Sequence, residues 1–426
     1  MNRLALCCVL ALYAGCGLAS RDVVTIRYWN GFTGPDGRTM LRMVKQFNAE
    51  NPDVRVTMQR MDWSTYYNKL FVAGLGGRAP ELFVIHAHTL ERFLQARFLD
   101  TVDDLVRGPN GIDESDLAEN VWAEVEHGGL HYGLPLDVHP LGMYYNKKLF
   151  REAGLVDATG EAAPPRTRDE FLDALGKLTR DTNGDGVTDQ WGYVFTWFRT
   201  NVVSYMAQWG GELFTPDFSR CVMNGPENVE ALQFSVDLIQ KYHYAPPPES
   251  YDSWIGVRQG KVGIVFEGVY MLADLQKQTD LDYGAAPVPV LGKRPAAWAS
   301  SHTLCLRAGL NDAQRQAAWR FMRFLSDHSL DWAEGGQVPV RRSLRETERF
   351  ARMPVQSAFA KELPYLSFLP NVPFIFEYLT EYDVAVEKAL RGSVTPQQAL
   401  DDATVRVDTV IARHRAMMDD AESVHE

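Results

Sequence analysis

The sequence predicts a layered α/β fold, because strand-like and helix-like segments alternate from the start of the folded region. Residues 23–29 are rich in β-branched and aromatic side chains and lead into a glycine-rich turn, which is typical of a strand. Between residues 38 and 50 apolar side chains recur at the helical period, until Asn51 and Pro52 end the pattern. Residues 54–58 again resemble a strand. This β-α-β unit is a building block of sheets covered by helices.

The same alternation continues along the chain. A second helix is predicted over residues 64–75, and the unbroken apolar run at 80–85 is typical of a strand buried inside a parallel sheet. Later strands are predicted at 130–134, 141–145, 263–266 and 303–306, and later helices at 168–179, at 227–242, around the apolar residues 317–325 and through most of the last ninety residues. Three Pro-rich or Gly-rich stretches, 133–140, 287–295 and 335–339, are candidate crossovers between two domains.

The first residues predict an exported lipoprotein. The apolar run from Leu4 to Ala14 follows Arg3 and is too short to span a bilayer, but it suits a signal peptide. We interpret residues 1–15 as that signal, Cys16 as the lipidated residue and 16–20 as a tether, which places the protein in the periplasm or at the cell surface. Tyr13 stands where lipoprotein signals usually have Leu, so cleavage near residue 19 and an uncleaved anchor are the alternatives.

The amino-acid composition limits which binding partners and which cysteine pairings the sequence predicts. About 400 residues follow the signal, enough for two domains, and the net charge of −12 comes without a run of like charges. An acidic chain repels a polyanion, so nucleic acid is excluded as a predicted partner. Beyond the signal and Cys16, Cys221 and Cys305 remain; a bridge is conceivable in an oxidising compartment, but buried free thiols are the preferred interpretation. No group of Cys and His in the sequence has zinc-finger spacing.

Six segments in order give the chain a family resemblance. Together they resemble the extracellular solute-binding proteins of ATP-driven sugar importers, the group that contains maltose-binding protein. The segments are residues 28–37, 47–52, 62–67, 133–137 leading into 144–147, 260–268 and 336–341.

The resemblance implies a two-lobe periplasmic-binding-protein fold of type II, in which each lobe is a mostly parallel sheet flanked by helices. Residues 21–137 plus 289–336 would form the N-terminal lobe, and residues 138–288 plus 337–426 the C-terminal lobe. The lobes would close about a hinge, as a monomer that serves ABC transporter permease subunits. Cys221 and Cys305 would then lie on opposite lobes, where a bridge would block the hinge, which is a second reason to expect free thiols.

Residues at strand ends supply the groups that sugar recognition requires. A pyranose has apolar C–H faces, which stack on aromatic rings, and a rim of hydroxyls, which bind polar side chains; open α/β sheets bind ligands at the carboxyl ends of their strands. The predicted ligand-binding residues are Trp29, Phe32, Asp62, Trp63, Tyr66, His86, His88, Asp137, His139, Tyr144, Trp197, Glu267, Tyr270 and Trp298. A neutral sugar is the favoured ligand, and an acidic sugar is the alternative, because Arg341 could bind its carboxylate.

Structural roles compete with these assignments. The tryptophans could instead be core filler, and His86 a structural histidine. Asp137 could cap backbone amides, and Glu267 the helix that follows it. His88 departs from the family, which often has an acid at that position, so an inherited hydroxyl contact there is in doubt.

One loop has the spacing of calcium ligands. Asp181, Asn183, Asp185 and Asp189 surround Gly186 as in the first half of an EF-hand loop, but Gly192 stands where the closing Glu would be. A structural calcium ion and a metal-free Asx-rich turn are the two interpretations. No other cofactor is predicted.

The function predicted from these observations is capture of a mono- or oligosaccharide between two lobes and its delivery to a permease by hinge closure. No catalytic activity is expected. The rivals are an exported glycoside hydrolase or lyase, which would need two carboxyls about 5–10 Å apart, and a sugar receptor without a transport role.

Overall fold

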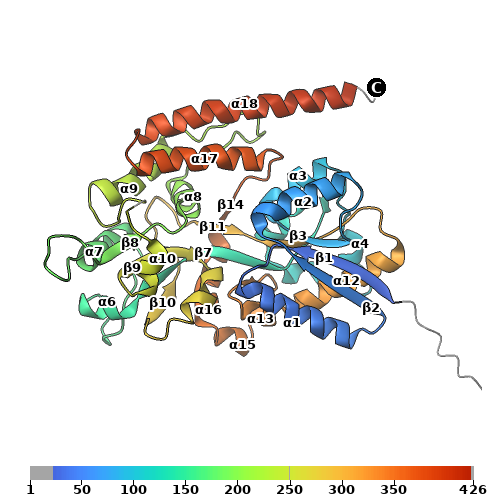
Figure 1. Ribbon diagram of the computed structural model, residues 1–426, viewed down its shortest axis with the longest axis horizontal. Coiled ribbons are helices and arrows are strands. Elements are labelled where there is room, and N and C mark those ends of the chain that lie inside the picture. Colours follow the sequence, from blue (N-terminus) through green and yellow to red (C-terminus); the bar gives the residue numbers. More distant parts are fainter. Residues whose placement is uncertain (1–22, 249, 424–426) are drawn as a thin grey trace, which may run out of the picture.

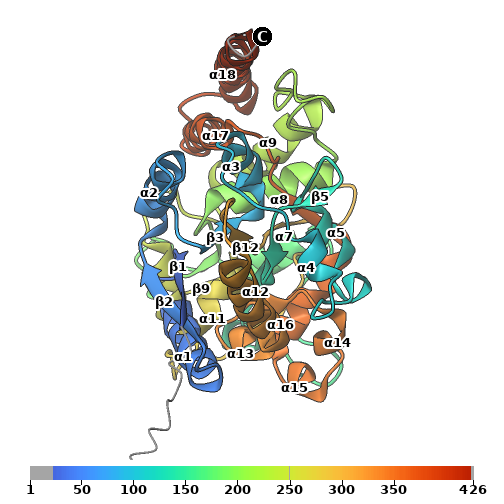
Figure 2. The ribbon, with the colours of Figure 1, turned by 90° about the vertical axis from the view of Figure 1, so that its right-hand side faces the viewer.

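The N-terminal elements build the first of the two large sheets. The structure is a computed structural model that describes residues 23–248 and 250–423. Five strands run in the order β2-β1-β3-β12-β6, namely Val54–Arg60, Val24–Asn30, Leu82–His86, His302–Leu306 and Leu134–Pro135. β1 is parallel to β2 and β3, whereas β12 is antiparallel to β3 and β6. This sheet and its helices form the first lobe, on the right in Figure 1 and facing the viewer in Figure 2.

The helices of the first lobe begin at recognisable caps. The Asp62 side chain accepts the Ser64 N–H at 2.9 Å at the start of α2, and Asn311 and Gln314 form a capping box at the start of α12. Phe321 of α12 packs edge-on against Tyr28 of β1. The helices are α1 (Pro35–Glu50), α2 (Trp63–Leu75), α3 (Leu90–Gln95), α4 (Asp103–Val106), α5 (Glu119–Ala123), α12 (Asp312–Asp327) and α13 (Ser329–Ala333), with the turns η1 (Ala87–Thr89) and η2 (Glu114–Asp116) and a hairpin of β4 (Glu126–His127) and β5 (Leu130–His131).

The second sheet is built around one long strand. β7 (Asp137–Asn146) is buried at every residue and pairs with four other strands. The order is β14-β11-β7-β9-β8, with β10 and β13 also paired to β7; the bounds are β8 (Trp191–Val194), β9 (Val262–Gly268), β10 (Tyr283–Ala286), β11 (Ala297–Ser300), β13 (Val338–Pro339) and β14 (Leu366–Phe368).

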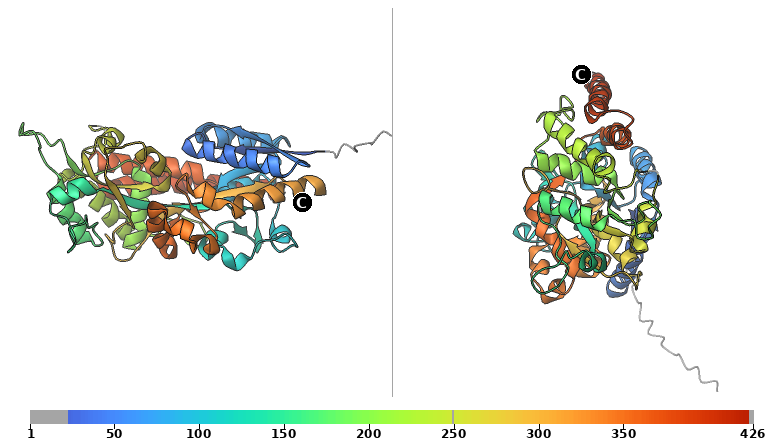
Figure 3. Two further views of the ribbon diagram at one scale, coloured as in Figure 1. Left: turned by 90° about the horizontal axis from the view of Figure 1, so that it is seen from below. Right: turned by 90° about the vertical axis from the view of Figure 1, so that its left-hand side faces the viewer.

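The second lobe carries most of the remaining helices. α17 and α18 lie along one edge of the molecule, and the elongated arrangement of the two lobes is clear from below (Figures 1 and 3). The elements are α6 (Lys147–Glu152), α7 (Arg168–Leu178), α8 (Phe198–Trp209), α9 (Pro226–Gln240), α10 (Ser253–Arg258), η3 (Val269–Met271), α11 (Leu272–Leu275), α14 (Arg342–Arg345), α15 (Glu348–Ala351), α16 (Pro354–Phe359), η4 (Ala360–Tyr365), α17 (Ile375–Leu390) and α18 (Pro396–Ser423). Among the described residues, none of these helices has the length and apolar character of a membrane span.

The α/β alternation and the individual elements predicted from the sequence are confirmed, but the expectation of mostly parallel sheets is wrong. β7 is antiparallel to β9, β10, β11 and β13, and parallel pairs remain between β8 and β9 and between β11 and β14. The sheets are mixed because β7 enters the second sheet from the first lobe and runs against its neighbours. Periodicity within a strand does not show which way a neighbour runs.

The chain changes sheets three times, between β6 and β7 near Asp137, between β11 and β12 near Ser301, and between β12 and β13 before Val338. The predicted lobe bounds are 137, 289 and 336. β11 still belongs to the second sheet, so the second change of sheet comes after residue 289. The division of the chain into lobes stays a prediction. Cys221 and Cys305 are buried free thiols, as predicted. The predicted signal peptide and Cys16 lie outside the described residues.

Candidate ligand-binding site

Aromatic side chains from both sheets meet where the chain crosses between them. We call five of these side chains the central cluster: Trp63, His86, His139, Trp298 and His302. His86 ends β3 and pairs in register with His302, the first residue of β12, while His139 in β7 pairs with Ser300 at the end of β11. The two crossings therefore bring the carboxyl end of one sheet against the long strand of the other.

The rings of the central cluster form a continuous path between the lobes. The Trp63 indole stacks on the His302 imidazole, with 5.8 Å between ring centroids and 12° between planes. His302 and His139 are 4.4 Å apart, and His139 and Trp298 6.1 Å apart, by the same measure. Trp63 belongs to the first lobe and Trp298 to the second, so each lobe contributes one large flat ring.

Gly31 makes room for the Trp63 indole. A Cβ at position 31 would lie 2.0 Å from the ring, and no side chain can be accommodated at that separation. The Trp63 ring also meets Phe32 edge-on at 5.8 Å. Gly31, which follows β1, therefore leaves the space that the ring occupies. The ring itself belongs to the first residue of α2.

Asp137 holds two of the histidines. Its Oδ1 accepts from His139 Nδ1 at 3.0 Å and the His302 backbone N–H at 3.2 Å, and its Oδ2 accepts from His302 Nδ1 at 2.7 Å and Trp332 Nε1 at 2.6 Å. A carboxylate has about four acceptor positions, and donors of the protein occupy four. The capping interpretation of Asp137 therefore has support from the backbone N–H of His302, and binding of a sugar hydroxyl by Asp137 stays a prediction.

Electrostatics around Asp137 follow from these bonds. Burial alone would raise the pKa of its carboxyl, yet the pKa lies far below the ordinary value because His302 and His139 stabilise the charged form. Burial, with His302 nearby, lowers the pKa of His139.

His86 and His88 are also held by the protein. The Tyr67 hydroxyl contacts His86 Nδ1 and accepts the His86 backbone N–H at 3.2 Å. Burial, followed by His302, His88 and His139, lowers the pKa of His86 well below its ordinary value. His88 Nδ1 lies 3.2 Å from the Ser300 hydroxyl, and burial, with Arg199 and His139, lowers its pKa to about 3. At neutral pH both imidazoles are uncharged hydrogen-bonding groups.

A second polar group lies in the second lobe. Glu267 is buried near the end of β9, where its carboxylate accepts the Gly268 N–H at 2.9 Å and hydrogen bonds to the hydroxyls of Thr196 and Tyr270. Burial raises the pKa of Glu267 to about 6 despite these bonds. Gly268 is the N-cap residue of η3, so this contact does not reach the N–H groups of the first turn, and η3 has no side-chain cap. Tyr270 lies beside Glu267 as part of the same group.

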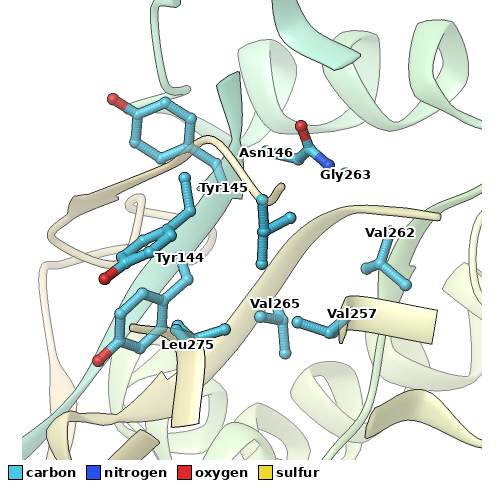
Figure 4. A pocket seen from close by; sticks show the side chains of 10 residues that line it. Tyr144, Tyr145, Asn146, Val257, Val262, Gly263, Val265 and Leu275 are labelled. Atoms are coloured by element: carbon cyan, nitrogen blue, oxygen red, sulfur yellow. The ribbon is translucent and has the colours of Figure 1, made fainter. Parts of the chain in front are cut away.

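Tyr144 faces a different, apolar space. Its hydroxyl donates to the Gly268 carbonyl at 3.4 Å, and its ring and that of Tyr145 lie across a small pocket of about 20 Å³ from Val262 and Val265 (Figure 4). The walls are largely aliphatic, so this pocket lacks the polar rim that a sugar needs.

Three predicted binding residues are structural in this fold. Tyr66 is fully buried and its hydroxyl donates to the Val84 carbonyl at 2.7 Å. Phe32 is fully buried against Trp332. Arg341, at the start of α14 in the second lobe, is held by two carboxylates of the first lobe, Asp116 at 2.8 Å and Asp327 at 2.5 Å. These contacts within the protein account for the burial and pairing of the three side chains, and their roles in ligand binding stay predictions.

Other predicted residues lie at the edge of the site or outside it. Asp62 caps α2, and Trp29 lies under the ammonium of Lys69 at 5.4 Å. Trp197 is 53% exposed at the start of α8, next to Thr196. The central cluster does not include these residues.

Sequence reasoning missed His302, Tyr67 and Trp332. All three contact predicted site residues. The pairing of β12 with β3 brings in His302, the packing of α2 against the end of β3 brings in Tyr67, and the position of α13 brings in Trp332. The one local signal was the position of His302 at the start of the predicted strand 303–306.

Several buried polar atoms near the crossings have no hydrogen-bond partner within the protein. They include Trp298 Nε1, Ser301 Oγ, Gln337 Oε1 and Asn30 Nδ2. Burying such a group without a partner costs about 1–3 kcal/mol, so native proteins rarely leave them unpaired. Atoms of this kind are candidates for hydrogen bonds to water or to a bound molecule.

The acidic side chains of the candidate calcium loop accept hydrogen bonds from other residues of the same loop. Asp181 accepts the backbone N–H groups of Gly184 and Gly186, each at 2.7 Å, and Asp189 accepts from the Thr182 hydroxyl at 2.6 Å. Both glycines have positive φ, as an Asx-rich turn requires. Calcium binding at Asp181, Asn183, Asp185 and Asp189 stays a prediction.

Comparison with known proteins agrees with this geometry. The sequence profile for bacterial extracellular solute-binding proteins matches residues 32–329. A putative binding protein of Brucella abortus is 24% identical over 403 residues, covering 92% of this chain and 93% of its own length. The maltotriose-binding protein of Pyrococcus abyssi is 23% identical over 360 residues, covering 81% and 73%.

The fold is also that of a solved relative. The ABC substrate-binding protein of Listeria monocytogenes, solved in complex with cycloalternan, superposes with a TM-score of 0.79 at 21% identity, over 92% of this chain and 100% of that one. The profile match extends over more than half of the chain, so it establishes the family without recourse to the ligands of the relatives. The chain is a member of the bacterial extracellular solute-binding protein family.

Proposed function

We propose that this chain is the sugar-binding subunit of an ABC-type importer, which captures a mono- or oligosaccharide between its lobes and delivers it to the membrane permease. The observation that carries the proposal is the central cluster, in which Trp63 and Trp298 come from opposite lobes with two imidazole rings between them. The proteins of similar fold or sequence named above bind cycloalternan or maltotriose, which supports a carbohydrate ligand.

The chemistry of the site suits a neutral sugar. Indole rings stack on the C–H faces of a pyranose, while Trp298 Nε1 and Gln337 Oε1 are buried polar atoms without a partner in the protein that could bond to its hydroxyls. Asp137 is a buried acid bonded to the histidines of the central cluster, and its charge would repel an anion. Arg341, the residue that kept an acidic sugar open, is already paired with two carboxylates.

Contacts between lobes provide a mechanism for closure. The start of α17, in the second lobe, meets α2 and α3 of the first (Figure 1). Arg92 lies 3.6 Å from Glu377 and over the Phe376 ring, which also packs against Tyr67. A ligand that touches both lobes binds the closed form better, so it shifts the population toward that form, and the permease can recognise the closed shape.

The remaining parts of the proposal concern location and chemistry. Membership of an extracellular family supports export, and we propose that Cys16 carries the lipid anchor. Enzymatic hydrolysis is disfavoured because Asp137, one of the acids it would use, has every acceptor position filled.

A ligand screen tests the proposal. The fragment from Ser20 onward is melted with mono-, di- and trisaccharides, reducing-end release is followed in parallel, and small-angle scattering is recorded with each hit. We expect a cognate sugar to raise the melting temperature, to be recovered intact and to compact the protein. Reducing-end release would identify an enzyme, and the absence of any stabilising sugar would contradict the proposal.

A further inference from the structure

Three histidines from two sheets share one small space. One ring nitrogen from each of His86, His139 and His302 lies within 4.8 Å of those of the other two. His139 and His302 are buried, and His86 is half-buried at the end of β3. Among the residues that the structure describes, this is the side-chain group with the spacing of metal ligands.

The protein already orients each imidazole through its Nδ1 atom. Asp137 accepts from Nδ1 of His139 and of His302, and the Tyr67 hydroxyl contacts Nδ1 of His86. Metal-binding histidines characteristically use one ring nitrogen for a carboxylate or another oxygen and the other for the ion. The bonds to Asp137 and Tyr67 thus leave Nε2 of all three rings as the ligand atoms.

Charge and geometry fit a divalent transition-metal ion. Imidazole nitrogens suit zinc, copper and nickel rather than calcium or magnesium. Zn–N bonds of about 2.0–2.1 Å require nitrogens about 3.3 Å apart in a tetrahedral site. One nitrogen of each ring already lies within 4.8 Å of the others, so rotation and a small approach of the rings would bring the three Nε2 atoms to that separation. The Asp137 carboxylate supplies one negative charge behind two of the ligands.

We propose that His86, His139 and His302 form a three-histidine site for a divalent transition-metal ion such as Zn²⁺, with a fourth position open to water or to a ligand hydroxyl. This goes beyond sugar capture and does not depend on it. The ion ties β3 and β12 of the first sheet to β7 of the second, so it stabilises one arrangement of the lobes. Three protein ligands with one open position is a known arrangement for zinc.

Metal binding by the chelator-stripped protein tests the site. Zn²⁺ is titrated by calorimetry, and Co²⁺ is added as a spectroscopic probe whose visible bands report four-coordinate geometry. We expect one ion per chain, a rise in melting temperature with Zn²⁺, and at least a 100-fold loss of affinity in His302→Gln and in His86→Gln. His86→Gln leaves the Asp137 bonds intact, so it remains informative if His302→Gln does not fold.

His127→Gln is the matched control, because His127 is an exposed histidine on the β4–β5 hairpin. It should bind Zn²⁺ and Co²⁺ like the parent protein. The proposal is overturned if the folded parent binds no ion, if the bands and affinity survive His86→Gln, or if His127→Gln loses them equally. Sugar binding is measured separately, so its failure would leave this test unaffected.

Discussion

Asp137 and Glu267 are both fully buried carboxylates in the second sheet, on the paired strands β7 and β9, yet their pKa values move in opposite directions. Asp137 receives two imidazole N–H groups, an indole N–H and a backbone N–H, whereas Glu267 receives two hydroxyls and a backbone N–H. Burial opposes the charged form at both. The difference teaches that the donors around a buried acid, rather than its depth, decide its charge.

The largest effect should come from replacing Asp137, the acid that receives the stronger hydrogen-bond donors. Asp137→Asn places an amide where four donors converge, so the donors of Trp332 and of the two histidines lose their charged acceptor. We expect a loss of about 3–5 kcal/mol in the free energy of unfolding, measured by denaturant titration. A loss below about 1 kcal/mol would show that the network is not structural.

The two lobes can be compared through their tryptophans. Trp63→Ala should weaken sugar binding by about 2–3 kcal/mol, because a stacked ring in a buried site is a typical hot spot. Trp298→Ala should cost a similar amount if both lobes grip the ligand. Calorimetric affinities measure this, with Trp197→Ala as the exposed control. Unchanged affinity in either central variant would remove that lobe from the binding site.

Glu267→Gln sharpens the electrostatic half of the comparison. The pKa of Glu267 in the folded protein, about 6, lies above the ordinary 4.5, so the folded state holds the proton more tightly than the unfolded state. Stability should therefore fall by about 2 kcal/mol as pH rises from about 4.5 to about 6. The variant should flatten that part of the stability profile, measured by unfolding across pH. An identical slope in variant and parent would contradict the raised pKa.

The smallest effect concerns the contact between lobes. Arg92→Ala removes a partly exposed ion pair with Glu377 and a ring contact with Phe376. Each is worth about 0.5–1 kcal/mol, so affinity for the cognate sugar should fall a few-fold. Lys148→Ala, which removes an exposed pair within the second lobe, is the control. Equal affinities would show that this contact does not contribute to closure.

Much of the fold followed from local patterns. The strand at residues 24–30, the helix that Asp62 caps and the buried strand at 262–268 lie within a few residues of their predicted positions. The direction of the strands did not follow, because a residue period of two is the same in parallel and antiparallel pairs. The position of the second crossing was also missed, since proline-rich stretches such as 287–295 mark turns but not membership of a sheet.

The sequence likewise predicted part of the candidate site and not the rest. His86, His139, Trp63 and Trp298 were predicted as binding residues, and the structure brings all four into one cluster. Their roles in binding remain to be measured by the experiments above. Tyr66 and Asp137 also have hydrogen-bond partners within the protein that the sequence did not show, because a buried hydroxyl or carboxylate pairs with the groups that the fold brings to it.

The sequence by itself determined the α/β alternation and the supply of aromatic and polar side chains at strand ends, because these depend on residues near one another along the chain. Only the tertiary structure decided that His302 pairs with His86, that Asp137 is saturated and that three imidazoles converge. Convergence and saturation depend on distances between segments far apart in sequence. Local periodicity carries no information about those distances.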